Sequence, residues 1–285
     1  MKQRLLILAL TLLGVSAYPY LVHAEDTADT KQELGITLEV NADVVSSYLW
    51  RGQNLGGISI QPSVTFGWKG LYVCGWANIG TDNWAFENLN PELDITIGYD
   101  NYGFQADLTH LHYFDGPYFP KSGFQAVPEQ ESSSTMEAHI GFHLGDLIES
   151  VPLSIDWYTT VFGADYYLKD GTDKRAWSTY IEAGYDFSLP FDLVLAARVG
   201  IVPWRSFYTN YEEVWTNAKT VAINNINLRL EREFELKSLY IGVWGECMLN
   251  CYGLDKTNLT TSLENKFDQR LNWCIGGYVC ISNDW

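Results

Sequence analysis

Basic residues are scarce in this chain of 285 residues, which has 18 Lys and Arg against 35 Asp and Glu and a formal charge of −17. An acidic chain repels phosphate backbones, which argues against a nucleic-acid partner. Long apolar runs are also scarce, because no stretch after residue 24 approaches the roughly 20 residues that a spanning helix needs. A membrane-spanning helix is therefore not expected in the mature chain, whereas a secreted β-sandwich or a β-barrel is compatible with the composition.

Cysteines are few and carry no paired motif. There are five, with no Cys-x-x-Cys, so at least one is unpaired unless it bonds another chain. They are Cys74, Cys247, Cys251, Cys274 and Cys280. We interpret them as small buried residues on strands, with Cys247 facing lipid and Cys274 and Cys280 facing the interior. No glycine-rich phosphate loop and no convincing metal-ligand cluster occurs either, so neither a cofactor nor a metal is predicted.

The first 24 residues have the pattern of a cleaved secretory signal peptide. Lys2 and Arg4 precede an apolar run over residues 5–15, and Val22 and Ala24 supply small residues at cleavage spacing. Cleavage after Ala24 leaves a short polar segment over residues 25–35 and takes the formal charge to about −19. No Cys lies at the cleavage point, so a lipoprotein is not expected.

Aromatic residues are abundant, with 11 Trp, 18 Tyr and 13 Phe. Barrels in the outer membrane place such residues in girdles at both interfaces. The last stretch alternates apolar with small or polar residues from Trp273 to Trp285, with Ile275, Val279 and Ile281 on one parity. A strand that ends in an aromatic residue is typical of the signal read by the barrel-assembly machinery, so Trp285 is the expected assembly signal and the outer membrane the expected location.

Alternation with a period of two residues can be tested at each hairpin, because a correct turn sets apolar residues opposite apolar ones. A turn at Lys69-Gly70 sets Trp68 opposite Leu71 and Phe66 opposite Val73. A turn at residues 100–101 sets Tyr99 opposite Tyr102, and one at residues 189–191 sets Phe187 beside Leu193. In each of the three hairpins, one face is apolar and the other is polar.

About twelve strands follow from this pattern. They cover residues 36–52, 58–68, 71–80, 92–99, 102–114, 135–144, 151–163, 177–188, 192–204, 220–234, 239–250 and 269–285. Short turns alternate with long links, and both termini lie on the side of the short turns. The predicted fold is all-β: one domain over residues 36–285, a closed antiparallel transmembrane β-barrel with short periplasmic turns and longer extracellular loops.

Residues 46–53 read Ser-Ser-Tyr-Leu-Trp-Arg-Gly-Gln. This motif resembles the TorF-type porin family, whose members carry Ser-Asp-Tyr-x-aromatic-Arg-Gly near the mature N-terminus. The resemblance continues through residues 61–62, 70–76 and 92–99, and it becomes diffuse in the second half of the chain. Ser47 stands where the family usually has Asp, and Asn54-Leu55 where it often has Ser-Gln. The resemblance implies a small outer-membrane barrel and no catalytic residues.

The polar parity is expected to face the enclosed interior, or lumen. Its members near the middle of the strands are Asp43, Asp94, Asp107, His139, Asp156, Glu182, Arg198 and Arg229. Five carboxylates against two guanidinium groups would make an open lumen prefer cations. Alternatively, these side chains fill and brace a narrow barrel.

The predicted registers place Glu182 beside Arg198 as a bracing ion pair and Asp94 beside Asp107 as a like-charged pair that needs water, a cation, a shared proton or an Arg. Arg51, on the inward parity at the outer rim, is interpreted as bracing a loop or contacting an anionic solute. Trp50, on the opposite parity, is interpreted as an interface anchor. Aromatic loop residues, including Trp204, Phe207, Tyr208, Tyr211 and Trp215, are expected to fold into a cap over the pore or to stack on a flat solute.

The most direct functional hypothesis is a passive channel for small hydrophilic solutes or ions with a preference for cations. A plugged barrel that serves as a structural or surface-binding protein is the alternative. A lipid-modifying enzyme is a third possibility, which would use His110 or His112 on the apolar face. Neither has a Ser two residues away, so no catalytic residues are predicted. The expected partners are outer-membrane lipid, the barrel-assembly machinery and small solutes or ions.

Overall fold

The computed structural model describes residues 35–81, 89–113, 134–148, 150–163, 165–169, 172–204, 206, 208, 221–250 and 271–284. The predicted signal peptide, nearly all of the polar segment and Trp285 lie outside these residues. Among the described residues, no helix has the length and apolar character needed to cross a membrane. Their one helical segment is the 3₁₀ turn η1 (Leu144–Asp146).

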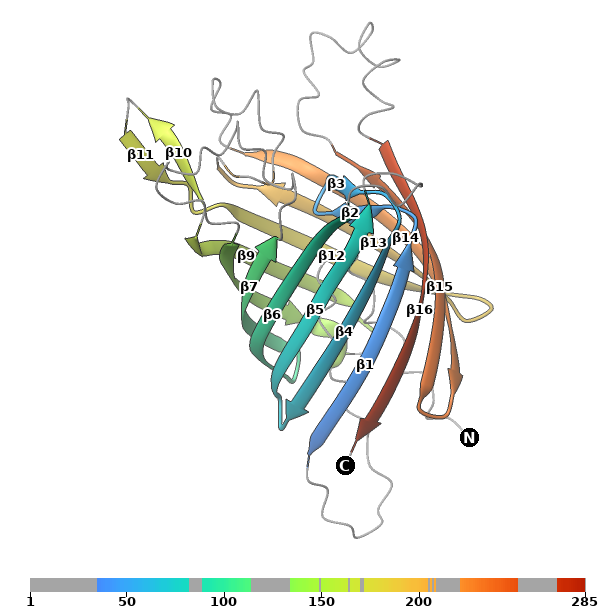
Figure 1. Cartoon of the computed structure of the whole chain (residues 1–285). Coiled ribbons are helices and arrows are strands. Elements are labelled where there is room, and N and C mark those ends of the chain that lie inside the picture. Colours follow the sequence, from blue (N-terminus) through green and yellow to red (C-terminus); the bar gives the residue numbers. More distant parts are fainter. Residues whose placement is uncertain are drawn as a thin grey trace, which may run out of the picture.

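Twelve antiparallel strands form one closed ring (Figure 1), in the order β1-β16-β15-β14-β13-β12-β9-β8-β7-β6-β5-β4. Their bounds are β1 (Ile36–Val45), β4 (Ser59–Trp68), β5 (Leu71–Thr81), β6 (Leu89–Asn101), β7 (Phe104–Tyr113), β8 (Ser134–His143), β9 (Leu153–Gly163), β12 (Thr179–Leu189), β13 (Leu193–Val202), β14 (Ala222–Leu236), β15 (Leu239–Leu249) and β16 (Leu271–Asp284). The first strand pairs with the last, so the ring has no open edge. The predicted fold class and strand number are confirmed.

Side chains alternate between the two faces of the wall as the period-two pattern predicts. On β4, Val64 is 50% exposed and Thr65 is 1% exposed, and the same alternation runs along β5. Exposed aromatic residues lie near both ends of the ring, for example Trp68 and Phe191 at one end and Trp204 and Trp273 at the other. The outside is thus an apolar band with aromatic margins, and the inside is polar.

One end of the ring carries the tight turns, together with the start of β1 and the end of β16, and we call it the tight-turn end. Lys69 and Gly70 have φ of 51° and 87° and form the predicted two-residue turn, with Trp68 opposite Leu71. The turn predicted at residues 100–101 is wrong. Tyr102 and Gly103, with φ of 51° and 71°, form it instead, because glycine supplies the left-handed conformation at the second position.

The register of β12 against β13 also differs from the prediction. The turn occupies residues 190–192, so Phe187 lies opposite Leu195 rather than Leu193. As a result Arg198 lies opposite Gly184, and its guanidinium pairs with Asp186 at 2.6 Å rather than with Glu182 as expected. A displacement by two residues keeps every side chain on its predicted face.

Four short strands lie outside the ring, and the sequence did not separate them from their neighbours. The strand predicted over residues 36–52 ends at Val45, and the chain then forms β2 (Tyr48–Trp50) and β3 (Gln53–Gly56). Likewise, β10 (Tyr166–Lys169) and β11 (Thr172–Arg175) form a hairpin in the link after β9. Both hairpins lie at the end opposite the tight turns, the long-loop end (Figure 1).

Four cysteines fall within the described residues, and none of the four forms a disulfide. Cys247 is exposed on the outer face, whereas Cys74, Cys274 and Cys280 are buried. The expected sides of the wall are confirmed, and Cys251 lies outside the described residues.

Candidate functional site in the lumen

The hairpin of β2 and β3, which we call the lumen hairpin, turns inward from the long-loop end. Trp50 pairs with Gln53, and the two residues between them form its tip. Arg51 and Gly52 have φ of 44° and 86°, values that suit the tight turn of a two-residue hairpin. A Cβ at Gly52 would lie 2.1 Å from the carbonyl oxygen of Asn224, so the tip touches the backbone of β14 where only glycine fits.

One side of the lumen hairpin is attached to β16. The backbone N–H of Ser46 donates to the carbonyl oxygen of Ile275 at 2.9 Å, and the thiol of Cys274 contacts the carbonyl oxygen of Ser47 at 3.1 Å. Leu49 packs in an apolar cluster that includes Met248 of β15. These contacts hold the base of the hairpin against the closing seam of the barrel.

The other side reaches across to β6 and β8. The hydroxyl of Tyr48 donates to Glu92 of β6 at 3.1 Å. The Arg51 guanidinium donates to both carboxylate oxygens of Glu137 on β8, with Nη1 to Oε2 at 2.5 Å and Nη2 to Oε1 at 2.9 Å. Strands β16 and β8 are six positions apart in the ring of twelve, which makes them opposite walls. The lumen hairpin therefore spans the interior of the barrel.

Two irregularities in the wall coincide with these contacts. The pairing of β13 with β14 shifts at Gly200, which leaves Asn224 as an extra residue that points inward. Its side-chain amide donates to the carbonyl oxygen of Arg51 at 2.8 Å. The pairing of β8 with β9 shifts at Glu137, the partner of Arg51. Such bulges redirect single side chains, and here the extra residue Asn224 holds the hairpin tip, whereas Glu137 keeps the regular inward parity of β8.

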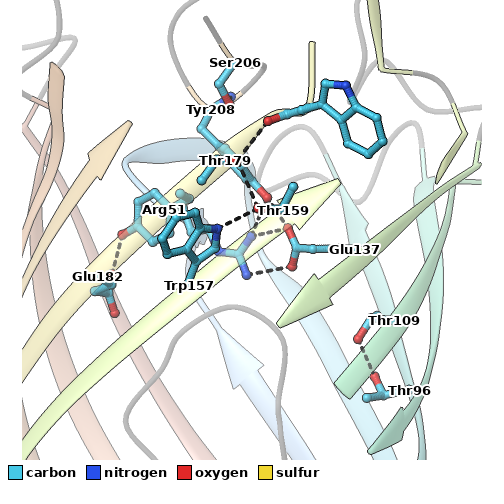
Figure 2. A network of polar contacts seen from close by, with 12 residues as sticks. Arg51, Thr96, Thr109, Glu137, Trp157, Thr159, Thr179, Glu182, Ser206 and Tyr208 are labelled. Atoms are coloured by element: carbon cyan, nitrogen blue, oxygen red, sulfur yellow. Dashed lines mark hydrogen bonds and ion pairs between the residues drawn. The ribbon is translucent and has the colours of Figure 1, made fainter. Parts of the chain in front are cut away.

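Arg51 is surrounded by aromatic rings as well as by its carboxylate, and Figure 2 shows its guanidinium facing Glu137. The guanidinium carbon lies 3.6 Å from the ring centroid of Tyr158, 5.3 Å from that of Tyr180 and 5.2 Å from that of Tyr208. Guanidinium groups bind the faces of such rings. The Tyr208 hydroxyl also hydrogen-bonds to Glu137.

The two predictions for this motif have different outcomes. The structure places Arg51 as a brace between loop and wall, one of the two roles expected for it. The prediction that Trp50 anchors the interface is wrong, because Trp50 is buried inside and packs on Tyr208 at 5.3 Å between ring centroids. The chain leaves the wall at Val45, so the parity of β1 no longer applies to Trp50. Among the loop aromatics, Tyr208 is fully buried, Trp204 is partly exposed, and Phe207, Tyr211 and Trp215 lie outside the described residues.

All eight candidate lumen residues lie on the inner face. Seven are buried, namely Asp94, Asp107, His139, Asp156, Glu182, Arg198 and Arg229, and Asp43 is half-buried. The structure brings three of them together: His139 Nδ1 lies 2.7 Å from Asp107, and His139 Nε2 lies 3.0 Å from Asp156. Each ring nitrogen of His139 thus faces a carboxylate oxygen, so both nitrogens can donate when the ring carries two protons.

The expected pair of Asp94 and Asp107 is wrong. Because the turn lies at residues 102–103, Asp94 is opposite Leu111, whereas Asp107 is opposite Gly98. Asp107 takes hydrogen bonds from Tyr72 and Gln105, each at 3.1 Å. Asp94 Oδ1 is buried without a hydrogen-bond partner.

The other charged candidates take part in local pairs or hydrogen bonds. Arg229 pairs with Glu231 at 2.8 Å and lies over the ring of Trp244, with the guanidinium carbon 4.0 Å from the centroid. Asp43 accepts a hydrogen bond from Asn41 at 2.5 Å, and Glu182 accepts one from Tyr180. The guanidinium groups of Arg198 and Arg229 are therefore paired with carboxylates on the adjacent strand or on their own strand.

Buried carboxylates outnumber buried guanidinium groups among the described strands of the wall. Arg198 and Arg229 of the wall, together with Arg51 of the lumen hairpin, face nine buried carboxylates on the wall strands. The carboxylates are Glu92, Asp94, Asp100, Asp107, Glu137, Asp156, Glu182, Glu231 and Glu246. The excess is negative, as expected from the sequence, and larger than the mid-strand positions alone indicated.

His112, on the outer face at the long-loop end, has a Ser neighbour that spacing along the chain did not reveal. Its Nδ1 lies 2.6 Å from the hydroxyl of Ser134 on the adjacent β8, and its ring stacks on that of His110 at 6.1 Å. Cross-strand pairing brings these residues together over 22 positions of sequence.

Several site residues were missed at the sequence level. Glu92 and Glu137 lie on the polar parity of their strands, so the alternation pattern contains enough information to find them. Asn224 faces inward only because of a bulge, and Tyr158 and Tyr180 become a site only when the hairpin tip reaches them. No local pattern reports such contacts.

The closed ring, its exposed apolar band and its polar interior define a transmembrane β-barrel. No family model and no curated protein matches the sequence. Among similar solved structures, an outer-membrane channel from Pseudomonas putida F1 is 10% identical with a TM-score of 0.43, covering 90% of this chain and 100% of that one. The monoaromatic hydrocarbon channel CymD is 10% identical with a TM-score of 0.38, covering 89% of each chain. Salmonella typhi OmpF in complex with daunomycin is 9% identical with a TM-score of 0.34, covering 88% of this chain and 97% of that one. Similarity at this level identifies no solute.

Proposed function

We propose that this protein is an outer-membrane channel for passive diffusion of small hydrophilic solutes or ions, with a preference for cations. The observation that carries the proposal is a twelve-stranded ring with a charged inner face. Side chains alone fill barrels of about eight strands, and a wider ring leaves room that wall side chains do not fill. In this barrel the lumen hairpin enters that room and narrows it.

The sign of the lumen charge supports the preference for cations. Nine buried carboxylates on the wall strands, against Arg198 and Arg229 of the wall and Arg51 of the hairpin, give the described lumen an excess of acidic groups. Rings of Asp and Glu select cations in other channels because they stabilise a cation that has lost part of its hydration.

Conductance across a planar bilayer tests the proposal. The purified barrel should give steady unitary steps, and the reversal potential under a salt gradient should have the sign of cation permeation. Correctly folded protein that gives no steps would contradict it.

A plugged barrel without transport is the second candidate, and the lumen hairpin is the observation that favours it. Its contacts with opposite walls place the hairpin across the lumen at that depth. The two candidates differ in whether solute flow occurs when the hairpin is intact, so the same recording distinguishes them.

A lipid-modifying enzyme is the third candidate, and the contact between His112 and Ser134 is what favours it. A Ser that donates to a His is the starting point of acyl transfer. We expect no turnover of phospholipid or lipopolysaccharide by the barrel in detergent. Turnover that Ser134→Ala and His112→Ala abolish would replace the channel proposal.

Two further proposals concern family and assembly. We propose membership of the TorF-type porins on the motif at residues 46–53, which forms the lumen hairpin and its approach. The C-terminal strand β16, with Trp285 following it in the sequence, would bring the chain to the barrel-assembly machinery and outer-membrane lipid.

A further inference from the structure

The site that holds Arg51 has the features of a ligand-binding site whose ligand is part of the same chain. We call it the Arg51 cage and define it as Glu137, Tyr158, Tyr180 and Tyr208. These residues come from β8, β9, β12 and the link after β13, so the cage is built by the barrel and not by the hairpin. Each of the four side chains is at most 4% exposed.

The barrel holds the cage in shape without help from Arg51. The Tyr180 hydroxyl donates to Glu182 and accepts from the side-chain amide of Asn225 at 2.9 Å. The ring of Tyr158 stacks on that of His139, with centroids 4.2 Å apart and an interplanar angle of 8°. Removal of Arg51 would therefore leave a formed site with a buried carboxylate that lacks its cation, a state that is costly in a protein interior.

The geometry selects a planar cation. Arg51 meets Glu137 through two nitrogens and two oxygens, a fork that an ammonium group cannot reproduce. Its guanidinium carbon also lies 3.6 Å from the centre of the Tyr158 ring, as in flat stacking of a delocalised cation.

We propose that the Arg51 cage is a binding site for solutes that carry a guanidinium group, with Arg51 as its resident intramolecular occupant. Arg51 is at the tip of a hairpin that enters from the long-loop end, so a solute that enters there meets the same site. A tethered group competes at an effective concentration in the millimolar range or above, and a free solute must exceed it to displace Arg51. The consequence for transport rests on the proposed function: displacement of Arg51 releases the hairpin tip and widens the lumen.

Guanidinium rescue of Arg51→Ala tests the site. The barrel, refolded in detergent, is heated with 0 to about 30 mM guanidinium chloride at constant ionic strength, far below denaturing concentrations. Because a ligand of the native state raises stability, the apparent unfolding temperature of Arg51→Ala should rise with guanidinium and not with sodium, ammonium or urea. The double variant Arg51→Ala, Glu137→Gln should lose the rise.

Two controls fix the interpretation. Wild type should respond to guanidinium at least about tenfold more weakly than Arg51→Ala, because its own arginine competes. Arg232→Ala, which removes an arginine outside the cage, should behave as wild type. If Arg51→Ala does not fold, Arg51→Lys keeps the charge without the fork and should respond more strongly than wild type.

Equal responses of the single and double variants, or of Arg51→Lys and wild type, would overturn the proposal. Conductance gives a separate result. If guanidinium rescues Arg51→Ala but no variant conducts, the cage stands and the channel function fails. If a variant conducts but guanidinium does not rescue Arg51→Ala, the channel function stands and the cage proposal fails.

Discussion

The wall of the barrel and the lumen hairpin are made of neighbouring residues, yet different forces place them. The wall follows from a local rule, since alternate side chains along each strand face lipid or lumen. Residues 46–56 leave this rule at Val45, and their positions depend on contacts with strands on both sides of the ring. The comparison teaches that a barrel's architecture can be fixed by periodicity while the filling of its lumen depends on one segment that departs from it.

The largest expected effect comes from breaking the Arg51–Glu137 pair, which should loosen the hairpin and leave the wall intact. Glu137→Gln leaves a buried guanidinium group without its carboxylate, and breaking such a pair costs about 3 to 5 kcal/mol. We expect much faster amide hydrogen exchange over residues 46–57, with the wall strands still protected. The control Glu246→Gln makes the same change on β15 and should leave the hairpin protected. Simultaneous loss of protection in hairpin and wall would contradict their independence.

The next effect concerns the wall alone. Ile95, in the middle of β6, points outward, and Ile95→Arg should destabilise the barrel in lipid by about 2 to 4 kcal/mol. Tyr102→Arg, at the exposed tight turn, should cost no more than about 1 kcal/mol because it lies near the interface. Urea unfolding in vesicles measures both. Equal costs at the two positions would be incompatible with a lipid-facing band.

A smaller effect is expected at the hairpin tip. Gly52→Ala adds a Cβ in a left-handed conformation against the Asn224 carbonyl, which costs roughly 1 to 2 kcal/mol for the backbone alone. Gly245→Ala is the matched control, since a Cβ at Gly245 meets nothing within 4 Å. Hydrogen exchange of the hairpin should accelerate in the first variant only. A protected hairpin in Gly52→Ala would show that the tip does not touch β14.

The smallest effect concerns ion selectivity. Asp94→Asn should lower the ratio of cation to anion permeability about twofold, because it removes a charge from the acidic lumen. Asp107→Asn should act less, since Asp107 already has His139, Tyr72 and Gln105 as hydrogen-bond partners. Reversal potentials under a salt gradient report the ratios. If neither variant changes selectivity, the acidic lumen does not control permeation.

The sequence predicted the faces of the wall better than its registers, for a physical reason. Moving the turn from residues 100–101 to 102–103 keeps Ile97 outward and Asp94 inward, so each side chain stays on the same face of the wall in both registers. Turn conformation decides between them, and Gly103 was the available signal. The separation of Arg198 from Glu182 has the same origin.

The candidate site was only partly predictable. The inward faces of Asp107, His139 and Asp156 followed from parity, but their mutual contacts depended on correct registers. The motif around Arg51 was recognised as distinctive without any indication that it crosses the lumen. Its partners Glu137 and Tyr208 lie 86 and 157 residues away along the chain, and no local pattern links them.

Single-channel recording of wild type beside a variant in which residues 47–57 are replaced by Gly-Ser-Gly tests the central claim most directly. The wall closes without the lumen hairpin, because β1 pairs with β16 and with β4 through residues outside it. Wild type should give small cation-selective steps, and the shortened variant should give steps several-fold larger with the same sign of selectivity. Equal conductance in the two proteins would contradict a lumen spanned by the hairpin.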